Sequence, residues 1–497
     1  KNQLPAEQLD NIRKELESLK KARPTWSQIW VLLARTEEQA GNIPAAIAAY
    51  RGAIDRGHSQ PTTMLRLIGL LASRKEFSEA DSLVRTYLDH AEWPRSGSFY
   101  QLASEIAVSM KDHKRGLEYA RKSAELQPDD TRSQMWLVQM LGGDENATAE
   151  IESTLRKAID ADRTKPSPWL RLIQHLAAAD RLSEAEEVLN DASEFVNEKE
   201  LSIFLAGGYE LLKQPRQAEE HYLAAVSLQS DNPMILSIVA EFYIRTGDLD
   251  KAEQLLDQLL SGELKVEPSI AFETRRRLAT IWARTDYSGL QRGLALLDEN
   301  LKDGKPPRQD LLLRARLLAQ YPRIDNRREA IRLFKELEAD APLVWEDEMR
   351  LAQLLVEPNQ QNEADQRWQK LASRNANQPS ALIAAIRHFH TRGQPELAMP
   401  LLKQLQTQNP NEAFAFELSA ENAARNGKVE DAVAIYRQYI ANAPADAERL
   451  PRMLQAAAMA SRIASPSLKI GLLPQQEKIL LDLAEENYKL AEATSPD

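Results

Sequence analysis

The chain has 497 residues, of which 28% are charged and 43% are hydrophobic, and its formal net charge is -11. This composition is typical of a folded, helix-rich protein and excludes wholesale disorder. Cysteine is absent, which excludes disulfides, thiolate metal sites and a cysteine nucleophile, and the negative charge opposes general binding to nucleic acid or anionic lipid.

The N-terminal segment predicts a capping helix over residues 5–20, within a region that we assign to 1–25. It lacks the apolar centre of a signal peptide, and no apolar run approaches the ~18 residues of a membrane-spanning helix, so we expect no membrane insertion by this chain. The chain opens on Lys1 rather than Met, which we interpret as the sign of a longer or processed product that carries an anchor or a second domain elsewhere.

A repeated pattern follows, shown by the stretch NGKVEDAVAIYRQYIANAP at 426–444. Aligning the chain on the Ala of this motif gives twelve positions at intervals of 33 to 41 residues, most often 34, which is far more regular than chance spacing. The positions, small in all cases but one, are Ala46, Ala80, Gly116, Ile151, Ala185, Ala218, Ala252, Gly293, Ala330, Ala364, Ala398 and Ala432.

Each unit predicts a pair of helices. Apolar residues have helical spacing before the turn, as at Leu33 and Ala34, and again after it, as at Ala46, Tyr50 and Ala53. Two helices approach closely only where neither carries a bulky side chain at the crossing, which explains the small residue.

Glycine and proline mark the helix ends. Gly in the left-handed conformation ends a helix, and Pro at a first helical position costs no hydrogen bond because its missing N–H would be unpaired there. The turn glycines, each five residues before its Ala, are Gly41, Gly247, Gly393 and Gly427. The prolines expected to begin first helices are Pro61, Pro166, Pro233 and Pro379.

With these residues at its helix ends, the chain resembles the tetratricopeptide repeat family, whose 34-residue pattern reads W-x2-L-G-x2-Y…A-x3-F…P. The stretches WVLLARTEEQAGNIPAAIAAYRGAI and LAGGYELLKQPRQAEEHYLAAV carry the resemblance. It implies an all-α fold, an α-α superhelix built as a right-handed solenoid of helix pairs. The expected units are 1–7 over 26–270, 8–9 over 271–343 and 10–12 over 344–444, with C-terminal capping helices at 446–463 and 474–492 inside a segment 445–497.

Residues 271–343 are irregular and basic. The two longest intervals, 41 and 37 residues, fall here, and 273–335 holds 15 Lys or Arg against 8 Asp or Glu. Insertions in a repeat array form surface loops, which often bind ligands. The other interpretation, that these arginines pair with acidic neighbours, has equal weight because charge runs are usually solvated faces.

The sequence shows no catalytic, metal or cofactor site. It contains no Walker-type loop, G-x-S-x-G elbow, G-x-G-x-x-G fingerprint or H-E-x-x-H motif. Its seven His are scattered, and the nearest pair, His388 and His390, stands two apart on a helix and so faces different sides. Paired carboxylates are assigned to solvated helix faces.

The resemblance implies that first helices line a binding groove. The candidate groove residues are Arg276, Arg316, Arg387, His390 and Glu421. An Arg in such a position would form a charge-assisted fork with a carboxylate or phosphate. The Lys and Asn clamp that one subfamily uses for a C-terminal carboxylate is not found in these positions.

Three functions remain in view. The leading hypothesis is a non-catalytic scaffold that binds a peptide or a partner helix, with an acidic partner favoured by the candidate arginines. The second is RNA binding through 273–335, which the acidic balance elsewhere makes the weaker hypothesis. The third is the recruiting arm of an enzyme whose catalytic domain lies outside the chain. The partner, the oligomeric state and the compartment are left open, with bacterial cytoplasm and cell envelope considered and the envelope slightly favoured.

Overall fold

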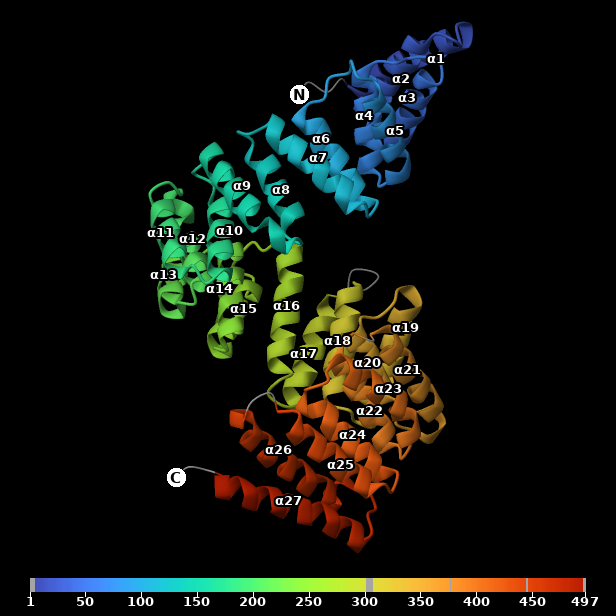
Figure 1. The fold of residues 1–497 in the computed structure, drawn as a ribbon. Coiled ribbons are helices and arrows are strands. Elements are labelled where there is room, and N and C mark those ends of the chain that lie inside the picture. Colours follow the sequence, from blue (N-terminus) through green and yellow to red (C-terminus); the bar gives the residue numbers. More distant parts are fainter. Residues whose placement is uncertain (1–4, 301–306, 376, 444–445, 495–497) are drawn as a thin grey trace. The chain divides into compact units, whose positions relative to one another are not determined.

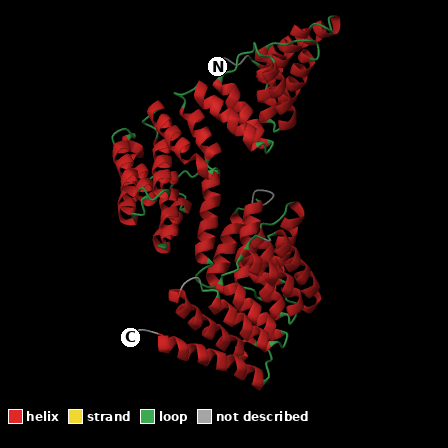
Figure 2. Ribbon diagram, in the orientation of Figure 1, coloured by secondary structure: helices red, strands yellow, loops and turns green. Residues whose placement is uncertain are grey.

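The computed structural model describes residues 5–300, 307–375, 377–443 and 446–494. The described residues form helices joined by short loops, without a β-strand (Figure 2). They divide into two compact units, Lys1–Val239 and Ala240–Asp497. None of the described helices has the length and apolar character that crossing a membrane requires.

The first unit begins with a single helix, and consecutive helix pairs follow it along the chain (Figure 1). The helices are α1 (Ala6–Ala22), α2 (Ser27–Gln39), α3 (Ile43–Ile54), α4 (Pro61–Ser73), α5 (Phe77–Asp89), α6 (Gly97–Ser109), α7 (His113–Leu126), α8 (Thr131–Leu141), η1 (Glu145–Ala147), α9 (Thr148–Ala161), α10 (Pro166–Ala178), α11 (Leu182–Ser193), α12 (Glu198–Leu211) and α13 (Pro215–Leu228). The boundary between the units falls within α14 (Pro233–Thr246).

The second unit continues the same arrangement of helix pairs. Its helices are α15 (Leu249–Leu260), α16 (Pro268–Trp282), α17 (Tyr287–Glu299), α18 (Arg308–Gln320), α19 (Ile324–Asp340), α20 (Trp345–Leu354), η2 (Pro358–Gln360), α21 (Gln361–Arg374), α22 (Pro379–Thr391), α23 (Pro395–Gln408), α24 (Ala413–Arg425), α25 (Val429–Ala441), α26 (Asp446–Ala464), η3 (Pro466–Leu468) and α27 (Pro474–Thr494). The fold is an all-α solenoid, as the sequence predicts. The subdivision of the array into numbered blocks of units stays a prediction.

The aligned small residues all lie on the second helix of a pair, from Ala46 on α3 to Ala432 on α25. Each aligned Ala is at most 1% exposed. A Cβ atom on Gly293 would lie 2.8 Å from the carbonyl oxygen of Ala279 on the preceding helix. The prediction of close helix crossings at these positions is therefore confirmed. Ile151, the one large residue in the series, is half-buried.

Eight of the described helix pairs have a left-handed residue in the turn between their two helices. The four glycines predicted from the sequence have φ between 68° and 88°. Four further pairs place a residue with a Cβ atom in the same conformation, again five residues before the aligned position, with φ between 59° and 64°. These residues are Lys75, Lys111, Asp180 and Lys213. The conformation thus belongs to the turn, because it occurs with and without Gly.

The predicted helix starts are also confirmed. Pro61, Pro166, Pro233 and Pro379 are the first residues of α4, α10, α14 and α22. The predicted terminal helices agree closely with α1, α26 and α27. Local backbone preferences therefore position the first helices, from which the candidate binding residues project.

Candidate binding site between first helices

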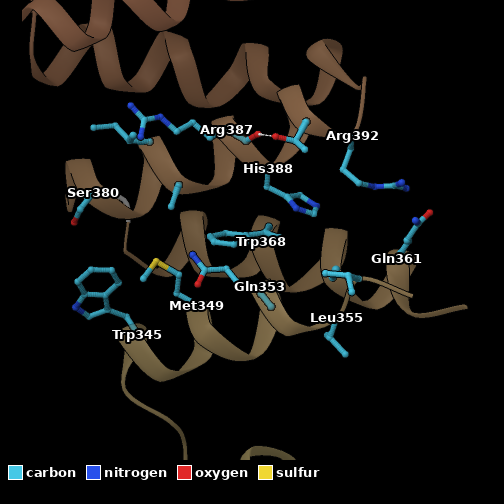
Figure 3. Close-up of a pocket in the computed structure, with 16 residues that line it drawn as sticks. Trp345, Met349, Gln353, Leu355, Gln361, Trp368, Ser380, Arg387, His388 and Arg392 are labelled. Atoms are coloured by element: carbon cyan, nitrogen blue, oxygen red, sulfur yellow. Dashed lines mark hydrogen bonds between the residues drawn. The ribbon is translucent and has the colours of Figure 1, made fainter. Parts of the chain in front are cut away.

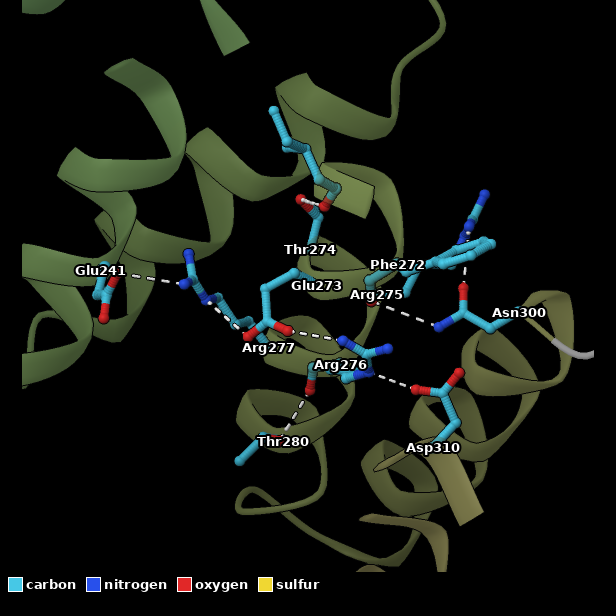
Figure 4. Close-up of polar contacts among 11 residues, drawn as sticks. Glu241, Phe272, Glu273, Thr274, Arg275, Arg276, Arg277, Thr280, Asn300 and Asp310 are labelled. Atoms are coloured by element: carbon cyan, nitrogen blue, oxygen red, sulfur yellow. Dashed lines mark hydrogen bonds and ion pairs between the residues drawn. The ribbon is translucent and has the colours of Figure 1, made fainter. Parts of the chain in front are cut away.

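Arg276 lies on α16 and is engaged within the protein. Its guanidinium pairs with Asp310 on the next first helix, α18, and its Nη1 atom lies 2.8 Å from Oε2 of Glu273 (Figure 4). The side chain of Arg276 is 16% exposed and that of Asp310 is 1% exposed. Arg277, beside it, pairs with Glu241 and Glu273. These charges therefore connect neighbouring helices of the second unit.

Arg316 on α18 makes the same kind of connection to α20. Its Nε and Nη2 atoms donate to the two carboxylate oxygens of Asp347, at 2.8 and 2.7 Å. The hydrogen bond to Asp347 outweighs the effect of burial and raises the pKa of Arg316. Arg350 also donates to Asp347, at 3.1 Å. The buried carboxylate of Asp347 thus accepts hydrogen bonds from two arginines.

His390 and Glu421 form a buried pair between α22 and α24. The Nδ1 atom of His390 lies 3.3 Å from Oε1 of Glu421, and its Nε2 atom lies 3.0 Å from Oδ1 of Asn422. His390 is 2% exposed and Glu421 is 6% exposed. Arg425 completes the cluster through its Nη2 atom, 2.8 Å from Oε1 of Glu421. In this structure both candidate residues face protein rather than solvent.

Most cations of the basic segment have a protein partner as well. The ion pairs, besides those of Arg276, Arg277 and Arg316, are Arg275–Glu299, Arg314–Asp298, Arg314–Glu329, Arg327–Glu357, Arg332–Glu336 and Lys335–Glu363. Arg292 and Arg323 lie over the rings of Trp282 and Tyr287. Lys302 and Lys305 lie outside the described residues. The structure thus has the internal pairing that the sequence offered as one of two interpretations.

Arg387 on α22 differs from the other four candidates. It is exposed and forms no ion pair with any described residue. Its backbone carbonyl accepts a hydrogen bond from Thr391 Oγ1 at 2.9 Å, which uses no part of the guanidinium (Figure 3). Arg387 is therefore a cation that can receive an external anion.

Arg387 stands on the edge of a cleft between the first helices α20 and α22, with a volume of about 870 Å³. One stripe of α22 faces it, formed by Ser380, Ile383, Ala384, Arg387, His388 and Thr391, which follow helical spacing. A matching stripe of α20 contains Trp345, Met349, Ala352 and Gln353. Figure 3 shows Trp368, from the second helix α21, between these two helices.

Trp368 forms the floor of this cleft. It is 2% exposed, and the ring of His388 stacks on it with 5.5 Å between centroids. Asp365 lies behind His388, with Oδ1 at 2.6 Å from His388 Nε2 and 3.6 Å from Arg392 Nε. The ring arrangement fixes one wall of the cleft, so that an occupant would meet a preformed apolar surface.

The sequence interpretation named Arg387 but missed the apolar residues around it. The available signal was the α22 stripe, in which Ile383 and Ala384 share one helix face with Arg387. A second and smaller cleft of about 410 Å³ lies between α16 and α18 and includes Arg276, Arg277, Arg284 and Arg316 in its lining.

Among the residues that the structure describes, no group of three or more His, Asp or Glu side chains is arranged to hold a metal ion. The candidate site consists of the apolar cleft and the exposed cation of Arg387. Its chemistry is that of binding: apolar burial combined with charge-assisted hydrogen bonding.

The sequence matches the family model described as tetratricopeptide repeat at residues 212–264 and 383–447. The second match begins within α22, at Ile383, and includes Arg387. No curated protein matches the sequence.

Several solved structures are similar. The C-terminal part of a repeat-containing protein from Cytophaga hutchinsonii has 12% identity and a TM-score of 0.37, covering 52% of this chain and 98% of its own. YrrB, described as a protein of this repeat family with an unusual peptide-binding site, has 15% identity and a TM-score of 0.32, covering 38% and 95%. A MamA fragment from Desulfovibrio magneticus has 16% identity and a TM-score of 0.30, covering 34% and 94%.

Proposed function

We propose that this chain, a tetratricopeptide repeat protein, is a non-catalytic scaffold that holds a peptide or a helix of a partner protein against its first helices. The family supports the general role in protein interaction. The observation that carries the finer proposal is the cleft between α20 and α22, which combines an apolar floor with the exposed cation of Arg387.

Of the five candidate groove residues, Arg387 is the one on which this proposal depends. Arg276 and Arg316 are paired with Asp310 and Asp347, so the charge of each is already balanced by a carboxylate of the next first helix. His390 and Glu421 contact each other in the protein interior, where Arg425 supplies the positive charge beside the Glu421 carboxylate. We propose that these four residues support the surface by fixing the positions of successive first helices.

Nothing in the site favours the RNA alternative. An RNA surface needs unpaired Lys or Arg to contact phosphates, whereas most described cations of 273–335 pair with carboxylates or lie over aromatic rings. Aromatic platforms for stacked bases are also expected in single-strand recognition. Trp282 and Tyr287 of this segment carry arginines on their faces instead.

The scaffold proposal is tested by affinity capture from native lysate followed by mass spectrometry. The baits are the wild type, Arg387→Glu, and the control Arg328→Glu, which alters an exposed arginine of α19 by the same charge. We expect a protein captured by the wild type and the control and lost with Arg387→Glu. Its interaction is then measured by titration with the purified components.

Two results would contradict the proposal. One is the recovery of the same proteins with all three baits, which would show that Arg387 does not contribute to binding. The other is recovery of nucleic acid whose binding to the purified chain weakens steeply with salt, which would favour the electrostatic RNA mode.

A further inference from the structure

We propose that the cleft between α20 and α22 binds an extended peptide segment of a partner, with a bulky apolar side chain against the half-buried walls Trp345, Met349 and Ile383 and a carboxylate of the same segment on Arg387. This inference rests on the proposed scaffold function and specifies the chemistry of the partner. It assigns one role to the apolar walls and another to the exposed cation.

The walls of the cleft are apolar and incompletely covered. Trp345, Met349 and Ile383 are half-buried, and Val356 at the end of the α20 stripe is 53% exposed. The volume of about 870 Å³ falls in the range of ligand pockets, roughly 300–1,000 Å³. An apolar side chain that enters this space removes both its own surface and that of the walls from water.

The shape of the cleft favours a peptide over a compact molecule. The α22 stripe runs from Ser380 to Thr391, which corresponds to ~16 Å at about 1.5 Å per helical residue. An extended chain covers that length with about five residues. Ser380 and Gln353 are exposed along opposite edges and can exchange hydrogen bonds with a peptide backbone.

The charge around the cleft selects an acidic segment. The charged lining residues are Arg387 and Arg392, and no Asp or Glu is among the lining residues that the structure describes. Arg392 and His388 share Asp365, so the uncompensated charge is that of Arg387. A guanidinium can bind a carboxylate through two parallel hydrogen bonds. Because the whole chain has a net charge of -11, attraction of an acidic peptide must come from this local cation.

The test uses a random dodecapeptide library displayed on phage and selected on the full chain. A parallel selection uses Ala384→Phe, in which a large side chain on the α22 stripe fills the cleft. We expect peptides enriched on the wild type alone, sharing one large apolar residue and an Asp or Glu within the next few positions. Two of them are then synthesised for titration.

In these titrations we expect affinity to fall by about 10-fold or more with Ala384→Phe and with Arg387→Glu, and to stay within about twofold with Arg328→Glu. Circular dichroism and a thermal melt verify that each variant is folded. If Ala384→Phe is unfolded, Val356→Gln replaces it, because Val356 is exposed and its loss removes one apolar wall.

Three results would overturn the inference: enriched peptides without acidic residues, equal binding to the filled variant, or no enrichment over the filled variant. Self-association of the wild type that disappears with Ala384→Phe would identify a second copy as the occupant and overturn it as well. If a partner protein from lysate binds Ala384→Phe and Val356→Gln as tightly as the wild type, the chain is still a scaffold, but this cleft is not its binding site.

Discussion

Arg316 and Asp347 connect two successive first helices through a two-pronged ion pair in which the carboxylate is fully buried. Arg276 and Asp310 repeat this relationship one unit earlier. In both cases a residue expected to face a ligand is held by an acidic residue of the next repeat. The pairs therefore belong to the interface between repeats.

Arg316→Met should destabilise the second unit, because it removes the main partner of the buried Asp347. Breaking a fully buried pair costs ~3–5 kcal/mol. Since the Arg316 side chain is 39% exposed and Arg350 still contacts Asp347, we expect roughly 1–3 kcal/mol. The measurement is the midpoint of urea unfolding. Arg328→Met, an exposed control, should leave it unchanged, and an equal shift for both variants would contradict the role of the pair.

The left-handed turns predict that replacing Lys by Gly and replacing Gly by Ala change the stability of the chain in opposite directions. Lys75→Gly, Lys111→Gly and Lys213→Gly should each stabilise the chain by about 0.5–1 kcal/mol, because the left-handed conformation is unfavourable for a residue with a Cβ atom. Thermal melts of the single variants test this prediction.

Gly427→Ala provides the reverse experiment. Gly427 has φ of 74°, so a Cβ atom at this position should cost ~1–2 kcal/mol. Gly69→Ala, in the interior of α4 with nothing within 4 Å of the added Cβ, should instead stabilise by about 0.5–1 kcal/mol. Shifts of the same sign in the two melts would be inconsistent with the turn assignment.

Ala432→Leu should overpack the crossing between α24 and α25. Ala432 is 0% exposed, and inserting methylenes into a packed core costs ~1–3 kcal/mol. Ala434→Leu places the same side chain on the exposed face of α25 and should change stability by less than ~0.5 kcal/mol. Urea unfolding of both variants separates the two positions, and identical midpoints would refute the crossing.

The Glu421→Gln substitution should reduce the free energy of unfolding by less in acid than at neutral pH. Burial raises the pKa of Glu421, but the hydrogen bond from His390 and the charge of Arg425 outweigh it and hold the pKa below the ordinary 4.5. A carboxyl with a lowered pKa adds stability above its unfolded-state pKa and loses it as the pH falls through the folded-state value. The wild type should therefore be more stable than Glu421→Gln by roughly 3 kcal/mol at pH 7, with the difference shrinking below pH 4.5.

The comparison is made by urea unfolding of both proteins from pH 7 down to pH 3. Glu430→Gln, an exposed control on α25, should behave like the wild type throughout. A stability difference between wild type and Glu421→Gln that grows toward low pH would show that the carboxylate of Glu421 is not the form that the fold stabilises.

The repeat, the helix pairs and their crossings could be predicted from the sequence alone. Those features depend on residues within one or two helical turns of each other: the apolar spacing, a glycine five residues before a small residue, a proline at a first helical position. They are local, so Gly427 and Ala432 could be interpreted without knowing what packs on them. The same reasoning missed the turns at Lys75 and Lys213, where packing of the two helices imposes a conformation that the residue itself disfavours.

Which charged side chains are available to a ligand depends on contacts between repeats and could not be predicted from the sequence. The partners of Arg276 and Arg316 are 34 and 31 residues away, and those of Arg121 and Arg367 are 29 residues away. Residues so far apart meet because successive repeats stack, and the pattern within one repeat does not fix which side chain faces which across that interface. The same stacking buries His390 against Glu421 and leaves Arg387 exposed beside an open cleft, because a side chain is free or paired according to its neighbours in space.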